Sequence, residues 1–203
     1  MAQTEKPPYY NDIQNFKKQD SISFPPKKAI LFIGSSSFTF WKDAQQRFPG
    51  YTIINRGFGG SSLHHLSYYI KDIVYPYNPK QVVIYCGEND LADSDTVSAA
   101  TVTGRFITLF HQIREKYPEI SIAFVSMKPS PSRERLIPKM AESNAAIRQF
   151  LKKQKNTAYI DVYTRMLDAN GHPRKELFTE DMLHMNKMGY DIWQKAFLPY
   201  LEK

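Results

Sequence analysis

Two short segments carry residue types that could together perform nucleophilic catalysis. Asp181 and His184 are three residues apart near the end of the chain, and Ser36 lies far upstream in Gly34-Ser35-Ser36-Ser37. A serine needs a base near neutral pH, and a carboxylate beside an imidazole base fixes its tautomer and stabilises its charged form. A three-residue separation places both side chains on one side of a turn or helix start. The pattern therefore indicates a nucleophilic hydrolase.

Two further segments could supply hydrogen-bond donors to such a reaction. One ends in Gly57-Phe58-Gly59-Gly60, and the other is Gly87-Glu88-Asn89-Asp90 after an apolar run. Acyl transfer develops negative charge on the carbonyl oxygen, so fixed donors aimed at that oxygen matter most. In isolation the first segment is a glycine-rich turn and the second an Asn-Asp turn. The first lacks the third glycine of GxGxxG, which disfavours a dinucleotide-binding loop.

The chain that must position these residues has 203 residues, enough for one domain with a substantial core. Its hydrophobic content of 42% and charged content of 23% are ordinary for a soluble globular protein. No apolar run has the length of a membrane span, and residues 1–26 lack the apolar core of a signal peptide. A signal peptide removed earlier would leave the same sequence. We therefore expect a soluble protein and leave open whether it is cytoplasmic or exported.

The charge and cysteine content exclude several other classes. The net charge of +7 comes from dispersed lysines and arginines, and the densest run, 152–155, ends a helical pattern. Positive charge suits a helix end, so we expect no nucleic-acid partner. The single cysteine, Cys86, excludes an internal disulfide and lies in a strand-like run, which favours a buried structural role. No histidines and carboxylates have metal-ligand spacing, so we expect neither a metal nor another cofactor.

Strand-like and helix-like segments alternate along the chain, which predicts a parallel sheet covered by helices. The strand candidates are 29–33, 52–55, 81–85, 121–125 and 158–162. The clearest helix precedes Pro118 and carries an apolar stripe of Val102, Phe106, Phe110, Ile113 and Tyr117. Two more helices are predicted at about 138–153 and 186–198. The fold class is α/β, a three-layer α/β/α sandwich of flavodoxin-like character with a central five-stranded parallel sheet.

Residues 1–26 are predicted to form an N-terminal arm that packs on the domain formed by 27–203. Ile13 and Phe16 are one helical turn apart, Asn11 is a candidate cap, and Pro25-Pro26 closes the segment. A strap over an edge of the domain is the simplest interpretation of this arm. A partner-binding arm and a substrate lid are the alternatives.

The four segments, in this order, resemble the blocks of the SGNH hydrolases, also called GDSL-like lipases or acylhydrolases. The resemblance covers residues 29–199 and implies the SGNH fold, with Ser36 as nucleophile, His184 as base and Asp181 as its partner. It also implies an oxyanion hole made by the N–H groups of Ser36 and Gly60 and the Asn89 amide. The sequence of this motif differs from GDSL here, since Ser35 and Ser37 replace Asp and Leu. Either of these serines is an alternative nucleophile.

The resemblance implies an esterase whose substrate is a small-molecule or carbohydrate ester. Five βα units use nearly the whole chain and leave no insertion for a lid or a lipid tunnel, which favours a short acyl group such as acetyl. Compact members of the family include carbohydrate acetylesterases and enzymes similar to platelet-activating-factor acetylhydrolases. Arg133, after the fourth strand, is a candidate for binding a polar or anionic substrate group, or for pairing with a nearby carboxylate.

Two other classes remain as alternatives. A non-catalytic carbohydrate-binding domain that retains the fold is supported by the altered GDSL letters and opposed by the intact Ser36, Asn89, Asp181 and His184. A flavodoxin-like nucleotide binder is disfavoured by the poor phosphate loop. The sequence does not specify the leaving alcohol or the oligomeric state.

Overall fold

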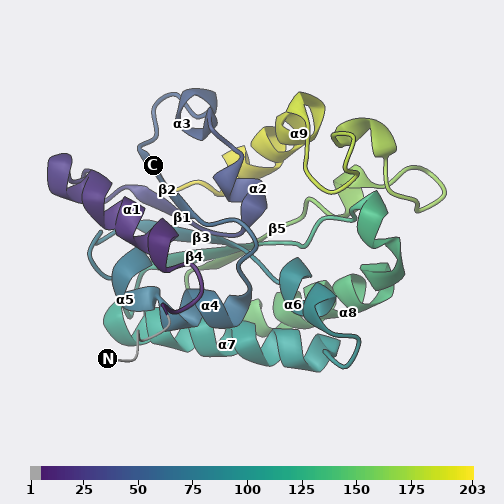
Figure 1. The fold of residues 1–203 in the computed structure, drawn as a ribbon, viewed down its shortest axis with the longest axis horizontal. Helices are drawn as coiled ribbons and strands as arrows, with labels where there is room; N and C mark the ends of the chain where they lie inside the picture. The colour runs from purple at the N-terminus through teal and green to yellow at the C-terminus, as the bar shows by residue number, and fades with distance from the viewer. Residues whose placement is uncertain (1–5) are drawn as a thin grey trace.

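The computed structural model describes residues 6–203 and contains a sheet of five parallel strands (Figure 1). The strand order β2-β1-β3-β4-β5 is that of the flavodoxin-like doubly wound fold. The strands are β1 (Ile30–Gly34), β2 (Ile53–Gly57), β3 (Gln81–Tyr85), β4 (Ser121–Val125) and β5 (Thr157–Ile160). All five predicted strands are present, with ends shifted by no more than two residues. Residues 1–5 of the predicted arm lie outside the described residues.

Helices cover both faces of this sheet and complete the three predicted layers (Figure 1). One face carries α4 (Leu63–Tyr68), α5 (Ile70–Ile73), α6 (Glu88–Asp93), α7 (Ala99–Lys116) and α8 (Ile137–Leu151). The other face carries α2 (Ser36–Thr39), α3 (Ala44–Arg47) and α9 (Lys187–Phe197). Short 3₁₀ segments are η1 (Pro131–Leu136), η2 (Thr164–Met166), η3 (Lys175–Leu177) and η4 (Leu198–Tyr200). None of the helices described in residues 6–203 has the length and apolar character that a membrane crossing requires.

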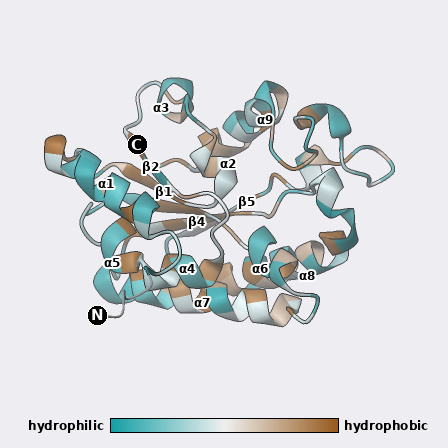
Figure 2. Cartoon of the chain, in the orientation of Figure 1, coloured by the Kyte–Doolittle hydropathy of each residue, from teal (hydrophilic) through white to brown (hydrophobic). Residues whose placement is uncertain are grey.

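Strand side chains alternate between two hydrophobic cores. Leu31 and Ile33 of β1 lie in the core beneath α7 and α8, whereas Ile30 and Phe32 lie in the core beneath α2 and α9. Since both faces of the sheet are covered, β1 carries no polar side chain at any position, rather than at every second one. Figure 2 shows this pattern as hydrophobic central strands between helices of mixed character.

Capping side chains mark the starts of two of the longer helices. Ser98 caps α7 by accepting a hydrogen bond from the Thr101 N–H at 3.1 Å, and the predicted apolar stripe of α7 is buried from Val102 to Ile113. Asn186 caps α9 in the same way, so this helix begins at Lys187. The helix predicted to run to residue 153 ends at Leu151, and a turn follows.

Helix α1 (Tyr10–Ile22) lies against the domain beside the β2 edge (Figure 1). Ile13 is 1% exposed and belongs to the core beneath α7. Asp20 pairs with Arg56 of β2 and accepts a hydrogen bond from the Tyr77 hydroxyl at 2.6 Å. The prediction that Asn11 caps this helix is wrong, because the helix already begins at Tyr10.

Candidate functional site

The strand register brings three of the predicted blocks to one edge of the sheet. Gly34, the last residue of β1, is paired with Gly57 of β2 on one side and Tyr85 of β3 on the other. The segments that contain Ser36, Gly60 and Asn89 follow directly after these three residues. The carboxyl edge of an open parallel sheet is where α/β folds place their sites.

Ser36 begins α2 immediately after a close contact between two strands. A Cβ atom at Gly34 would lie 2.0 Å from the Tyr85 carbonyl oxygen, so only glycine fits there. The chain then turns into α2, and Ser36 is partly buried at its first position. Within residues 6–203 the Ser36 N–H has no hydrogen-bond acceptor. It is therefore free to bind an oxygen placed beside the serine.

Gly60 lies in a left-handed turn, with φ of 81°, beside the first helix. The Tyr9 hydroxyl donates a hydrogen bond to the Gly60 carbonyl oxygen at 2.8 Å. The N–H of Gly60 makes no hydrogen bond to the described part of the chain. A Cβ atom at the neighbouring Gly59 would lie 3.9 Å from Cβ of Ser36, which places this turn next to the serine.

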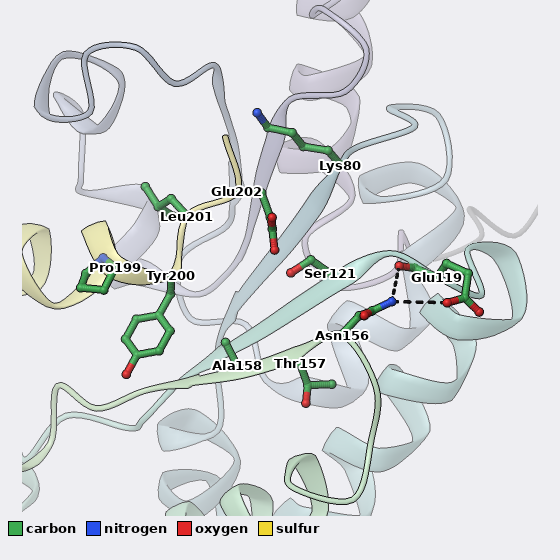
Figure 3. A pocket seen from close by; sticks show the side chains of 10 residues that line it. All are labelled: Lys80, Glu119, Ser121, Asn156, Thr157, Ala158, Pro199, Tyr200, Leu201 and Glu202. Atoms are coloured by element: carbon green, nitrogen blue, oxygen red, sulfur yellow. Dashed lines mark hydrogen bonds between the residues drawn. The ribbon is translucent and has the colours of Figure 1, made fainter.

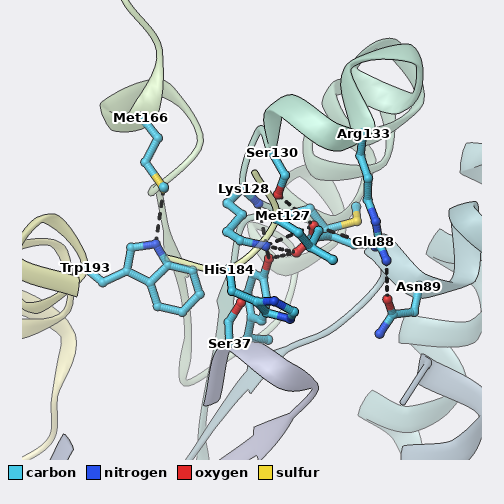
Figure 4. A network of polar contacts seen from close by, with 12 residues as sticks. Ser37, Glu88, Asn89, Met127, Lys128, Ser130, Arg133, Met166, His184 and Trp193 are labelled. Carbon is cyan, nitrogen blue, oxygen red and sulfur yellow. Dashed lines mark hydrogen bonds and ion pairs between the residues drawn. The ribbon is translucent and has the colours of Figure 1, made fainter. Parts of the chain in front are cut away.

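Asn89 lies on α6, and its side-chain amide is held between two partners from other segments. Its Nδ2 donates to the Ser61 carbonyl oxygen at 2.8 Å, and its Oδ1 accepts from Nη2 of Arg133 at 2.8 Å. The Ser61 hydroxyl in turn donates to the Gly34 carbonyl oxygen at 3.2 Å. This chain of hydrogen bonds joins the Asn89 amide to the turn that carries Ser36. Arg133 thus contacts a predicted site residue (Figure 4).

Asp181 and His184 form a close pair in the loop after η3. His184 Nδ1 lies 2.5 Å from Asp181 Oδ2, and the backbone N–H groups of Leu183 and His184 both donate to Oδ1 at 2.9 Å. Burial tends to raise the pKa of this carboxyl, but these backbone and ring donors lower its pKa well below the usual range. The ionised carboxylate accepts the proton of Nδ1, which leaves Nε2 of His184 available as a base.

His184 lies over α2 but is not bonded to the serine. Its ring packs edge-on against Phe40, with centroids 4.7 Å apart, and Phe40 follows Ser36 by one helical turn. Between the described residues there is no hydrogen bond from the Ser36 hydroxyl to His184. Catalytic hydrogen bonds of this type often tighten only in the substrate complex.

A buried ion pair lies behind Asn89, and sequence reasoning missed it. Lys128 Nζ lies 2.7 Å from Glu88 Oε1, and both side chains are at most 5% exposed. Ser130 and Tyr85 also donate to the Glu88 carboxylate. Burial tends to raise the pKa of Glu88, but the Lys128 ammonium lowers the pKa below its usual value. Figure 4 shows this network, with Arg133 between it and Asn89.

A signal for this pair was present in the sequence. Glu88 stands three residues after the end of β3, close enough to the covered sheet for its carboxylate to be buried, and a buried carboxylate needs a cationic partner. Lys128 occupies the corresponding position after β4, the neighbouring strand. This matching position becomes apparent only once β4 is known to lie beside β3, which the structure shows.

The other histidines have capping or exposed positions. His65 stands at the third position of α4, where its Nδ1 accepts from the Ser62 N–H at 3.2 Å, and burial with the adjacent His64 lowers its pKa to about 4. His111 and His172 are exposed. In residues 6–203 no three His, Cys, Asp or Glu residues form a group suited to a metal ion.

The opposite edge of the sheet contains a polar hollow of about 550 Å³. Lys80, Ser121 and Thr157 line it at the starts of β3, β4 and β5, and Asn156 donates to Glu119 at its rim (Figure 3). None of the predicted site residues reaches this hollow. The candidate site therefore remains at the carboxyl edge.

The doubly wound sheet is the fold of the SGNH hydrolases. The chain belongs to the GDSL-like lipase/acylhydrolase family, whose model matches residues 20–192, and it is accordingly an ester hydrolase of the acylhydrolase type. Among curated proteins, no relative matches it.

Several solved structures share the fold at low sequence identity. A candidate acylhydrolase from Bacteroides fragilis is similar with a TM-score of 0.82 and 21% identity, over 96% of this chain and 97% of that one. A GDSL-like lipase from Bacteroides thetaiotaomicron has a TM-score of 0.79 and 20% identity, over 92% and 95%. An acetyl-xylooligosaccharide esterase from Geobacillus Stearmophilus has a TM-score of 0.68 and 16% identity, over 87% and 94%.

Proposed function

We propose that this acylhydrolase is a serine esterase that removes a short acyl group, above all acetyl, from a carbohydrate or a related small substrate. Ser36 Oγ attacks the ester carbonyl carbon while its proton passes to Nε2 of His184. The oxyanion is held by the N–H groups of Ser36 and Gly60 and by the Asn89 amide. His184 then gives the proton to the leaving alcohol, and Asp181 stabilises its charged ring in between.

Deacylation follows the same path with water as the nucleophile. His184 takes a proton from water, whose oxygen attacks the acyl carbon bound to Ser36. Collapse of the second oxyanion returns the serine with its proton and releases the carboxylic acid. The observation that carries the proposal is the Asp181–His184 pair, which leaves Nε2 free above the helix that begins with Ser36.

The acetyl preference is supported by the compact fold. The connections after β1, β2 and β3 pass into short helices near the proposed nucleophile, with no inserted lid among the described residues. The acetyl-xylooligosaccharide esterase shows that this fold carries such activity elsewhere. A second candidate function is a carbohydrate-binding domain without catalysis. The observation that favours it is the departure of Gly34-Ser35-Ser36-Ser37 from the GDSL motif.

Labelling with a fluorophosphonate tests the proposal, since only an activated serine reacts. We expect one phosphonate on Ser36, no labelling of Ser36→Ala, and normal labelling of Ser35→Ala. Ser36→Ala should also lose hydrolysis of p-nitrophenyl acetate while keeping the melting temperature. An unlabelled wild-type protein that still bound acetylated oligosaccharides would favour the carbohydrate-binding alternative.

We also propose that residues 1–26 act as an arm fastened to the hydrolase domain of 27–203. Buried Ile13, the Asp20–Arg56 pair and the Tyr9–Gly60 hydrogen bond support this division. The last contact joins the arm to a proposed oxyanion donor, so a strap is favoured over a mobile lid.

A further inference from the structure

The Asn89 amide is held in a single orientation by partners of opposite type. A guanidinium only donates hydrogen bonds, so the group facing Arg133 must be Oδ1. A carbonyl oxygen only accepts, so the group facing Ser61 must be Nδ2. One hydrogen of Nδ2 is used by Ser61. Within residues 6–203 the second hydrogen has no acceptor, so it is available to an oxyanion.

Arg133 is itself fixed from both sides. Its side chain is 18% exposed, and Nη1 lies 3.8 Å from Oε2 of the buried Glu88. Its backbone N–H donates to the Ser130 carbonyl oxygen at 2.9 Å. The N–H of the preceding Ser132 donates to the Met182 carbonyl oxygen at 3.0 Å, inside the loop that carries Asp181 and His184. Arg133 and the preceding Ser132 therefore join the Gly87–Asp90 segment to the Asp181–His184 segment.

We propose that Arg133 is a positioning residue that holds the Asn89 amide with Nδ2 toward the reacting oxygen. This inference rests on the proposed esterase function. Without Arg133, only the Ser61 carbonyl oxygen would select this orientation, and a half-turn of the amide would present Oδ1 to the developing oxyanion and replace an attraction by a repulsion. This role differs from the substrate binding that the sequence suggested for Arg133, because the guanidinium already contacts Asn89 and Glu88.

A double-mutant cycle with a neutral substrate separates these roles. On p-nitrophenyl acetate, Arg133→Met should lower kcat about 10- to 100-fold, as misplacement of a catalytic group does, with KM changed less than about 2-fold. In an Asn89→Ala background the same change should have almost no effect, because the group that Arg133 positions is gone. Arg133→Lys should recover part of the rate.

Arg135→Met is the matched control, since Arg135 lies on the same 3₁₀ segment and pairs with the exposed Asp95. It should leave kcat and KM unchanged. A loss of kcat by Arg133→Met that is equally large with and without Asn89 would overturn the inference. A rise confined to KM would also overturn it and return Arg133 to substrate binding.

A measurement independent of turnover completes the test. The side-chain amide signals of Asn89 in a ¹⁵N-labelled sample are identified by their loss in Asn89→Ala. They should shift in Arg133→Met and stay in place in Arg135→Met. An inactive wild-type protein would refute the esterase function alone, whereas unmoved amide signals would refute the positioning role of Arg133.

Discussion

Replacing Lys128 with methionine leaves the Glu88 carboxylate buried without its closest ion-pair partner. Lys128 is 1% exposed and Glu88 5%, and Nζ lies 2.7 and 3.1 Å from the two carboxylate oxygens. Removing one partner of such a pair costs about 3–5 kcal/mol. Tyr85 and Ser130 would still donate to Glu88, and Arg133 Nη1 would remain 3.8 Å from it, so we expect about 3 kcal/mol, at the low end of that range. In a domain of this size that corresponds to a melting temperature about 6–12 °C lower.

The pH dependence identifies the cause of this loss. With Lys128 gone, burial dominates and should raise the pKa of Glu88 above its value in the unfolded chain. A carboxyl with a raised folded-state pKa contributes stability below the unfolded pKa and loses it as the pH rises. The stability deficit of Lys128→Met relative to wild type should therefore widen from about pH 5 to about pH 8.

Urea unfolding followed by the fluorescence of the buried Trp41 and Trp193 measures both effects. Lys187→Met is the control, because Lys187 pairs with Asp191 at the surface and should matter by less than about 0.5 kcal/mol. Adding Glu88→Gln to Lys128→Met should recover part of the loss. A deficit below about 1 kcal/mol, or one that is the same at both pH values, would refute the assignment of a buried charge pair.

Three other predictions concern the reaction and the fold. Asn89→Ala should lower kcat about 10²–10³-fold at nearly constant KM, as loss of an oxyanion donor does, and a change in KM alone would place Asn89 in substrate binding. In an ester series kcat/KM should be highest for acetyl and fall steeply by octanoyl, although each buried CH₂ would favour binding by about 0.8 kcal/mol; preference for octanoyl would exclude the acetyl proposal. His65→Gln should flatten the pH dependence of folding stability between about pH 6.5 and about pH 4, since the unfolded histidine takes up its proton first and stability is lost as the pH falls. Glutamine can keep the cap of α4, and an unchanged slope in urea unfolding, with exposed His172→Gln as control, would contradict this assignment.

The sheet, and the meeting of the motif segments at its carboxyl edge, could be predicted because both depend on local patterns. Continuous apolar runs mark strands covered on both faces, and short strands leave little freedom in where they end. Once the strands are parallel, the residues that follow them meet at one edge. The register Gly34–Gly57–Tyr85 therefore gathers segments that the sequence already marked by glycine and asparagine.

The contacts around Asn89 could not be predicted in the same way. Arg133 and Lys128 come from a different strand end, roughly 40 positions away, and their charge alone suggests solvent-exposed side chains. Whether Lys128 is buried depends on which strand lies beside β3 and on whether the loop after that strand folds back over the end of β3. From the sequence alone, the role of Arg133 could therefore be either substrate binding or pairing with a carboxylate.

The proposed oxyanion donors depend on residues outside the motif as well as on the motif itself. Such donors stabilise a developing charge only when they are oriented before the charge appears. Gly60 is in contact with Tyr9 of the arm, and Asn89 is held by Arg133 of η1. The motif thus marks the groups that we propose face the substrate, while residues outside the motif restrict how those groups can move. A substitution at Tyr9 or Arg133 would leave every motif residue intact and still disturb the proposed oxyanion hole.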